Sequence, residues 1–168
     1  TYAMTKRMLL TGLRALHKQY GMNYLYFVPN TLFGPNFDLD DSHFIFDLIK
    51  KICAAKMEEP HTPPTLWGSG NQKRELIFIP DAVELMMKAL TEQNNEIINF
   101  GTGKEHSIRD YAKAICNFVG YNFDRIQFDT SAFEGVQSKR LEPNETAGAC
   151  DQTDLIEALE ITIAYYIS

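Results

Sequence analysis

Tyr2 and Lys6 have the types and spacing of a proton-transfer pair. Residues four apart in a helix lie on one face, about one turn from each other. An ammonium group within ~4–6 Å of a phenol stabilises the phenolate, and so lowers a tyrosine pKa that is ordinarily about 10. Such a tyrosine can exchange a proton with a carbonyl or alcohol oxygen near neutral pH. The same spacing also arises by chance on a solvated helix end, so the pair alone does not establish an active site.

Several short motifs follow this pair in order along the chain: VPNTLFGP at 28–35, WGSG at 67–70 with RE at 74–75, FIPD at 78–81 and NFGTG at 99–103. Together they resemble the extended short-chain dehydrogenase/reductase family of nucleotide-sugar enzymes, the NAD-dependent epimerase/dehydratases. The resemblance reaches to about Leu141. It implies an α/β fold, the second half of a doubly wound Rossmann-type domain with a smaller α/β substrate-binding lobe.

A narrower resemblance rests on Ser42-His43 before a predicted helix, on the GSG and RE motifs, on VGY at 119–121 and on SKRL at 138–141. These are similar to the branch of the family that epimerises and reduces GDP-4-keto-6-deoxymannose to GDP-L-fucose with NADPH. Two other hypotheses stay open. One is a 4-epimerase or 4,6-dehydratase of a UDP- or dTDP-sugar. For the protein as a whole NAD stays possible in place of NADP, because the residue that would choose between them is absent from these 168 residues. The other is a non-catalytic nucleotide-sugar-binding module, because the glycine-rich turn that binds a dinucleotide pyrophosphate is absent from these 168 residues.

The resemblance implies catalytic roles for three residues. Tyr2 would protonate the 4-keto oxygen during reduction, and Lys6 would bind the nicotinamide ribose and lower the pKa of Tyr2. His43 would be the acid of epimerisation at C3 and C5, which requires a group that titrates near pH 7. The implied cofactor contacts are Tyr2, Lys6, Pro29, Thr31, Leu32 and His43.

The implied substrate contacts are mostly cationic, as expected for a sugar diphosphate: Lys51, Trp67, Arg74 and one of Lys139 or Arg140. Ordinary alternatives exist for each motif. A histidine at a helix start is often a surface residue, a lone tryptophan often packs in a core, and Arg74-Glu75 can be a surface charge pair. The GTG at 101–103 lacks the full dinucleotide motif, and we interpret it as a tight turn.

The chain departs from the family at four points. The catalytic serine that precedes the tyrosine and the cysteine that partners the histidine are absent. Asn30-Thr31 reverses the usual threonine–asparagine order, which puts the asparagine contact in doubt. Lys51 stands where an arginine is expected, and a lysine lacks bidentate geometry on a phosphate.

Composition sets the limits within which these residues must be positioned. The chain has 168 residues, about one domain, with 45% hydrophobic and 23% charged residues. Sixteen basic against 22 acidic residues give a net charge of −6, which argues against nucleic acid or an anionic membrane as a partner. Cys53, Cys116 and Cys150 form no CxxC motif, which indicates a reducing compartment, so we expect a cytoplasmic protein. The histidines have no metal-ligand spacing.

Hydrophobic periodicity and breaker residues predict alternating helices and strands, hence the α/β class. Helices are predicted over 3–19, 42–56, 80–90, 107–119 and 151–167. Strands are predicted over 23–28, 65–67, 74–78, 96–100 and 125–128, with a loop at 29–41 and an irregular segment at 130–146. Expected caps are Gly21, Ser42, Ser107 and Gly120, with Pro80 in a first helical turn.

The chain opens directly into helical periodicity at Thr1, and we expect an upstream portion to precede it. We assign 1–35 to the end of a dinucleotide-binding domain, with 74–105 returning to it, and 36–73 and 106–168 mainly to the substrate lobe. The resemblance also implies a homodimer formed through the helix that carries Tyr2, whose exposed face would include Met4, Met8 and Leu9.

Overall fold

The computed structural model describes residues 1–38, 40, 43–57, 62–132, 134–142 and 152–168, and it confirms the α/β class. The helices are α1 (Tyr2–Tyr20), α2 (Phe44–Met57), α3 (Ile79–Glu92), α4 (Ile108–Val119) and α5 (Leu155–Ile167), with a 3-10 turn η1 (Phe123–Arg125). The strands are β1 (Leu25–Pro29), β2 (Thr31–Phe33), β3 (Thr65–Trp67), β4 (Lys73–Arg74), β5 (Leu76–Phe78), β6 (Glu96–Phe100), β7 (His106–Ser107), β8 (Gln127–Asp129) and β9 (Ser138–Lys139).

The described residues form four small sheets, and the pairing of their strands is mostly parallel. β1 pairs with β6, β2 with β5 and β3 with β8, all in parallel. β4 pairs with β7 antiparallel and with β9 in parallel. Parallel pairs require long crossover connections, and here helices supply them.

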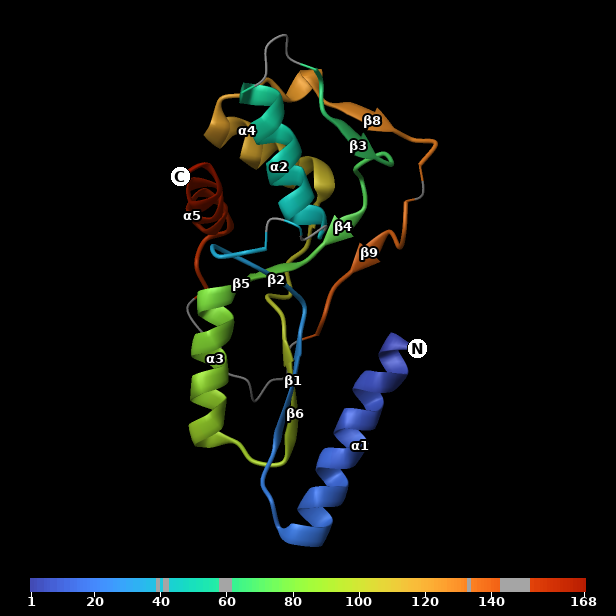
Figure 1. Cartoon of the computed structure of the whole chain (residues 1–168), viewed down its shortest axis with the longest axis vertical. Coiled ribbons are helices and arrows are strands. Elements are labelled where there is room, and N and C mark those ends of the chain that lie inside the picture. The colour runs from blue at the N-terminus through green and yellow to red at the C-terminus, as the bar shows by residue number, and fades with distance from the viewer. Residues whose placement is uncertain (39, 41–42, 58–61, 133, 143–151) are drawn as a thin grey trace.

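The lower part of Figure 1 is a layered unit in which β1 and β6 lie between α1 and α3. A hydrophobic cluster holds α3 to the strands through Leu85, Ala89, Ile98 and other residues. Phe27 and Phe100 stack across the two strands with ring centroids 5.0 Å apart. On the other side, the Tyr26 hydroxyl donates to the Lys6 carbonyl of α1 at 2.7 Å. Helices on both faces of a parallel pair are the doubly wound arrangement that the sequence implied.

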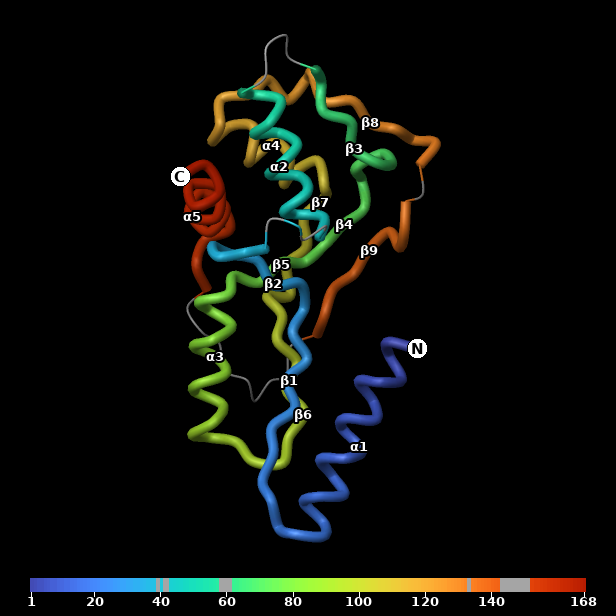
Figure 2. Tube along the Cα trace, viewed as in Figure 1, coloured from blue at the N-terminus to red at the C-terminus, as the bar shows by residue number. Residues whose placement is uncertain are grey.

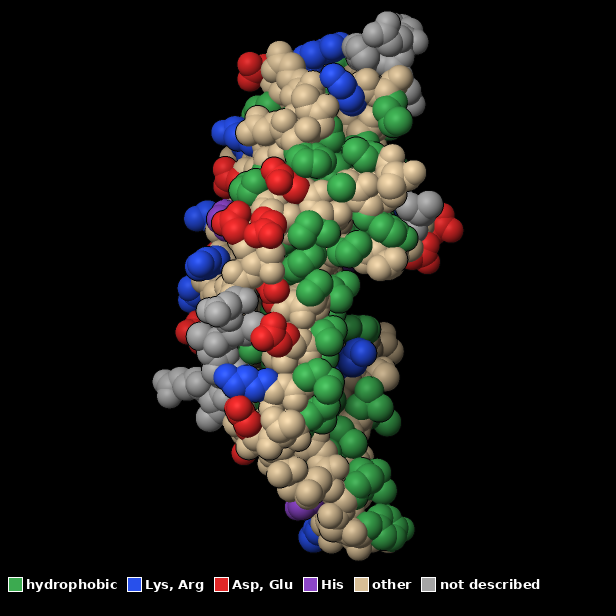
Figure 3. Space-filling model, turned by 90° about the vertical axis from the view of Figure 1, so that its left-hand side faces the viewer, with side chains coloured by type: hydrophobic (Ala, Val, Ile, Leu, Met, Phe, Trp, Pro, Cys, Tyr) green, Lys and Arg blue, Asp and Glu red, His purple; other side chains and the backbone are tan. Residues whose placement is uncertain are grey.

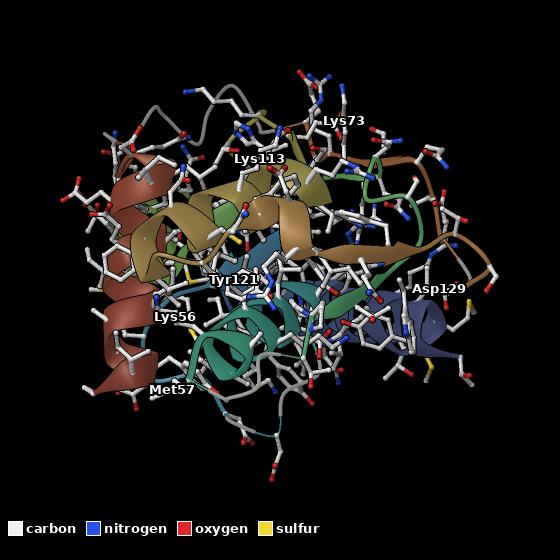
Figure 4. All side chains as sticks on the ribbon, turned by 90° about the horizontal axis from the view of Figure 1, so that it is seen from above. Lys56, Met57, Lys73, Lys113, Tyr121 and Asp129 are labelled. Atoms are coloured by element: carbon white, nitrogen blue, oxygen red, sulfur yellow. The ribbon has the colours of Figure 1, made fainter. Side chains whose placement is uncertain are left out.

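The upper part is built around a larger cluster from α2, α4 and α5. Seen from above in Figure 4, Tyr121 points in between these helices, and Lys56 lies beside it. The Lys56 ammonium donates to the Gly120 carbonyl at 3.0 Å. Cys53 and Cys116 are free, buried thiols, and burial raises the pKa of each to about 11. Cys150 lies outside the described residues. The domain boundaries and the cytoplasmic location stay predictions.

Local signals at the helix ends account for most of the correct boundaries. Gly21 is left-handed at φ 67° and ends α1, and Gly120 at φ 71° ends α4. Ser107 and Asp110 form a reciprocal capping box at the start of α4. Pro80 lies in the first turn of α3. The predicted cap Ser42 lies outside the described residues, as does Asp151, and α5 is capped by Asp154.

Three short strands were not predicted: β7 (His106–Ser107), and two within segments that we expected to be irregular. Thr31–Phe33 forms β2 inside the predicted loop 29–41, and Ser138–Lys139 forms β9 inside 130–146. Both strands have partners far along the chain, in β5 and β4. Residue 125, predicted as strand, belongs to η1. Short strands made by distant pairing leave little local pattern to detect.

Exposed apolar side chains follow one face of the molecule (Figure 3), and on α3 they are Ile79, Val83, Met87 and Leu90. On α1, Met4, Met8 and Leu9 are 60%, 70% and 55% exposed, and the helix has no buried residue. Over the part of the chain that the structure describes, no helix combines the length and apolar character needed to cross a membrane.

Candidate functional site

A cavity of about 450 Å³ lies where α1, the end of β1 and the start of α2 meet the segment after β9. We call it the Tyr2 cavity. Seven residues predicted from the sequence line it: Tyr2, Pro29, Thr31, Leu32, His43, Lys139 and Arg140. These residues come from four separate stretches of the chain. The structure therefore brings together the groups that the resemblance assigned to proton transfer and to the nicotinamide, except Lys6, which does not line the cavity. The roles of all these residues stay predictions.

Tyr2 and Lys6 lie one turn apart on α1, as the spacing predicted. The Lys6 ammonium is 5.3 Å from the centroid of the Tyr2 ring, within the range of a cation–π contact. Tyr2 is 78% exposed, so its hydroxyl is open to a ligand in the cavity. His43 is also exposed and precedes α2, and its carbonyl accepts from the Asp47 N–H at 3.0 Å.

The wall formed by residues 29–32 is fixed by Asn30. Its backbone N–H donates to the Phe100 carbonyl at 2.8 Å, which extends the β1–β6 ladder by one residue. Its side-chain oxygen accepts from the Thr31 N–H at 2.8 Å, and its side-chain nitrogen donates to Glu75 at 2.5 Å. The reversed Asn30-Thr31 order put the usual asparagine contact in doubt. In this structure the Asn30 amide holds the cavity wall in position.

A second cavity of about 490 Å³ lies between α2, β3 and β4, and we call it the Trp67 cavity. Lys51, Trp67 and Arg74, three of the five predicted substrate contacts, line it together. Trp67 is 73% exposed, so the alternative of a core tryptophan is wrong. The Lys51 ammonium lies 2.9 Å from the Asp47 carboxylate and 5.9 Å from the centroid of the Trp67 ring.

Arg74 is held by backbone carbonyls. Its Nη1 donates to the carbonyls of Lys73 and Val136 at 2.7 and 2.8 Å, and the residue is half-buried. This orders the guanidinium at the edge of the cavity before any ligand arrives. Lys139 and Arg140 line the Tyr2 cavity instead, and Arg140 forms an ion pair with Glu142 at 3.2 Å.

The Gly-Ser-Gly motif after Trp67 forms a turn that requires glycine. Gly68 and Gly70 have φ of 78° and 75°, and a Cβ on Gly70 would lie 2.5 Å from Phe128. Arg109 anchors the turn by donating to the Ser69 carbonyl at 2.7 Å while its guanidinium stacks on Phe128 at 3.7 Å. The GTG at 101–103 is also a turn, and the Gly103 N–H is engaged by Glu75 rather than directed to a phosphate.

Sequence reasoning missed three residues that line or support these cavities. Glu134 lines the Trp67 cavity and accepts from the Ser69 N–H, and hydrogen bonding by Ser69 lowers the pKa of Glu134. Gln72 lines the same cavity, is 5% exposed, and its Oε1 has no hydrogen-bond partner among the described residues. Glu75 is fully buried, so the alternative that Arg74-Glu75 is a surface charge pair is wrong for Glu75.

Comparison with known proteins agrees with this arrangement. The sequence model of the NAD dependent epimerase/dehydratase family matches residues 1–101. The chain belongs to this family. A GDP-L-fucose synthase of Sinorhizobium fredii is 36% identical over 143 residues, which cover 83% of this chain and 45% of that protein. The chain therefore spans about half the length of the curated relatives that it matches.

Solved structures of epimerase/dehydratase enzymes share the fold. UDP-glucose 4-epimerase of Thermotoga maritima, solved with UDP-glucose, has a TM-score of 0.84 at 19% identity and covers 99% of this chain and 53% of its own. A GDP-L-fucose synthetase of Naegleria fowleri bound to NADP has a TM-score of 0.82 at 24% identity, covering 99% and 55%. At these identities, the likeness establishes the Rossmann-like fold.

Proposed function

We propose that the protein carrying this chain converts GDP-4-keto-6-deoxymannose to GDP-L-fucose by epimerisation and NADPH-dependent reduction. The observation that carries the proposal is that Tyr2 and His43 line one cavity, beside a second one lined by Lys51, Trp67 and Arg74. This reaction needs two acid–base functions from the protein. One group donates a proton to the keto oxygen, and another exchanges protons at the carbons next to it. The similarity to GDP-L-fucose synthase supports the choice of substrate.

The Tyr2 cavity fits the nicotinamide end of a dinucleotide. Pro29 and Leu32 offer apolar surface to a ring, and the Tyr2 hydroxyl offers a polar group to its ribose. Lys6 does not line the cavity, but its ammonium lies beside the Tyr2 ring, from where it would reach the ribose. When bound, the nicotinamide supplies or accepts the hydride. We propose NADP as the cofactor. NAD stays the alternative, because the residue that would select between NAD and NADP is absent from these 168 residues.

Tyr2 donates a proton to the 4-keto oxygen as it becomes an alcohol, and Lys6 keeps a positive charge beside the resulting phenolate. His43 donates to, or accepts from, carbons next to the keto group during epimerisation. In the Trp67 cavity, Arg74 and Lys51 neutralise the diphosphate, and the Trp67 ring offers a flat surface to the nucleoside. The substrate would thus extend from one cavity to the other.

Two other functions remain distinguishable from this one. The likeness to a structure solved with UDP-glucose favours a 4-epimerase or 4,6-dehydratase of a UDP- or dTDP-sugar. A non-catalytic nucleotide-sugar-binding module would use the Trp67 cavity alone. We also propose a homodimer, in which the exposed Met4, Met8 and Leu9 of α1 lie in the contact.

The test is thermal unfolding of this 168-residue chain with GDP-, UDP-, dTDP- and CDP-sugars, followed by turnover in the longer protein. A ligand that binds the native state stabilises it by RT ln(1 + [L]/Kd), about 2.7 kcal/mol at a hundredfold excess over Kd. The proposal expects a shift selective for GDP-sugars and turnover of the keto sugar. A shift selective for UDP or dTDP supports the first alternative. GDP-selective binding without turnover supports the module.

A further inference from the structure

Glu75 joins three distant parts of the chain through one buried carboxylate. The residue lies between β4 and β5 and is 0% exposed. Its Oε1 accepts from the Gly103 N–H at 2.7 Å and from the Thr102 hydroxyl at 3.2 Å. Its Oε2 accepts from the Asn30 side chain at 2.5 Å and from the Leu141 N–H at 2.7 Å. Hydrogen bonds of this kind compensate a carboxylate for the loss of water.

The donors come from segments that meet at the Tyr2 cavity. Asn30 follows β1 and belongs to the cavity wall, and Thr102 and Gly103 follow β6, the partner of β1. Leu141 belongs to the segment after β9 and also lines the cavity. In Figure 2 the chain descends from β9 toward the β1–β6 pair. The Asn99 side chain donates to the Glu142 carbonyl at 3.2 Å and so adds a second tie to this segment.

The close approach of these segments depends on Gly101. A Cβ at this position would lie 2.7 Å from Glu75 Oε1 and 3.0 Å from the Leu141 carbonyl oxygen. Any side chain there would therefore push the Leu141 segment away from the carboxylate. The buried carboxylate of Glu75 can therefore hold the Leu141 segment only because residue 101 is a glycine.

We propose that Glu75 is a positioning residue that sets the width of the Tyr2 cavity. It holds the Asn30 wall and the segment carrying Lys139 and Arg140 at a fixed separation, while its neighbour Arg74 lines the Trp67 cavity. The proposal rests on the proposed function, since the geometry it protects is that of the two cavities. Glu75 touches neither cavity, so its effect on the reaction passes through Asn30 and Leu141.

Asp81 provides a matched control, because it is also a buried acid but holds a different part of the fold. It is 7% exposed and accepts from the N–H and the hydroxyl of Thr153 at 2.9 and 2.7 Å. It thus ties α3 to the start of α5, and it lines neither the Tyr2 cavity nor the Trp67 cavity. Asp81→Asn measures what the loss of a buried carboxylate costs in stability alone.

The experiment compares Glu75→Gln with Asp81→Asn in the longer protein. Glutamine keeps the size of the side chain but has one acceptor oxygen, so either Gly103 or the Asn30–Leu141 pair faces an N–H donor. For Glu75→Gln we expect kcat to fall about 10- to 100-fold, as for a reacting group displaced by about 1 Å. We also expect faster hydrogen exchange at the amides of Gly103 and Leu141. Asp81→Asn should lower Tm and leave kcat, KM and those two amides unchanged.

The outcomes distinguish a failure of the proposed function from a failure of the positioning role of Glu75. If wild-type protein neither binds nor turns over the GDP-keto sugar, the proposed function fails, and with it this role. If wild type is active and Glu75→Gln keeps its kcat, or loses kcat without faster exchange at Leu141, the positioning role alone is overturned. If Glu75→Gln does not fold, Gly101→Ala serves in its place, because its Cβ forces the Glu75 carboxylate and Leu141 apart without removing the acid. An unchanged kcat in that variant also overturns the role.

Discussion

Arg74 and Lys139 are register partners across β4 and β9, and each lines a different cavity. One two-residue strand pair therefore sets the distance between the proposed diphosphate site and the proposed reacting site. The first two turns of α2 and the residue before them make a second boundary. His43 and Phe46 line the Tyr2 cavity, and Asp47 and Lys51 line the Trp67 cavity. A ligand that fills both cavities must cross this boundary.

Replacing Tyr2 by phenylalanine should abolish reduction and leave nucleotide-sugar binding nearly intact. The hydroxyl is removed while the ring and its contact with Lys6 remain, so the loss is that of a general acid, about 10²- to 10⁴-fold in kcat. Turnover is followed by nicotinamide absorbance in the longer protein. Tyr20→Phe, at the other end of α1, is the control and should match wild type. Near-normal turnover in Tyr2→Phe would reject the role of Tyr2.

His43→Ala should block proton exchange at C3 and C5 of the sugar. We expect incorporation of solvent deuterium to slow by about 10²- to 10⁴-fold, because the proposed proton donor is lost. The incorporation is measured by NMR or mass spectrometry. His17→Ala is a suitable control, since His17 lies at the far end of α1 and contacts the Met22 carbonyl at 3.0 Å. Unaltered exchange in His43→Ala removes this residue from the mechanism.

The single tryptophan should report occupation of the Trp67 cavity. Trp67 is exposed and lines that cavity, so a bound nucleoside diphosphate should change its fluorescence emission. Arg74→Lys should weaken this binding about 10- to 100-fold, since it loses charge-assisted hydrogen bonds and a lysine cannot restore their geometry. Lys113→Met, on the outer side of α4, is the control (Figure 4). Equal affinities in wild type and Arg74→Lys would exclude Arg74 from the site.

The sequence predicts well those elements whose ends carry local chemistry. Gly21 ends α1, Ser107 caps α4, and Tyr2 and Lys6 share a helix face, as their spacing requires. β2 and β9 were missed because each exists only through a partner more than 40 residues away. The burial of Glu75 was missed because its four donors converge only after β1 has paired with β6 and β4 with β9. Motif resemblance found residues that line the two cavities, but it carries no information on the groups behind them.

Two glycine substitutions should have opposite effects on stability. Gly70→Ala places a Cβ 2.5 Å from Phe128 and 2.9 Å from Arg109 at a φ of 75°, so we expect a loss of about 1–3 kcal/mol. Gly12→Ala meets nothing within 4 Å inside α1 and should add helix stability, about 0.5–1 kcal/mol. Urea unfolding measures both. A neutral Gly70→Ala would contradict the described turn.

The capping box of α4 should make stability depend on acidity. Hydrogen bonds from the Ser107 side chain and backbone lower the pKa of Asp110. A carboxylate with a lowered folded-state pKa contributes stability above its ordinary pKa, about 3.9, and this is lost as pH falls through the folded-state value. Asp110→Asn should therefore cost about 1 kcal/mol at pH 7 and progressively less below about pH 4. Glu84→Gln, on the exposed face of α3, is the control. If Asp110→Asn lost the same unfolding free energy at pH 7 and below about pH 4, the capping box would not be the source of the effect.

Tyr24 and Asn95 are 71 residues apart, yet the Tyr24 N–H donates to the Asn95 side chain and the Asn95 N–H to the Tyr24 carbonyl. The β1–β6 ladder begins beside them. The chain between these two paired strands, which includes α2 and α3, is therefore one long connection that closes when the ladder forms. Closing such a loop is slow compared with helix formation. The helices should therefore appear early during refolding, and the Tyr2 cavity, whose wall follows β1, should become competent to bind ligand only when the ladder closes.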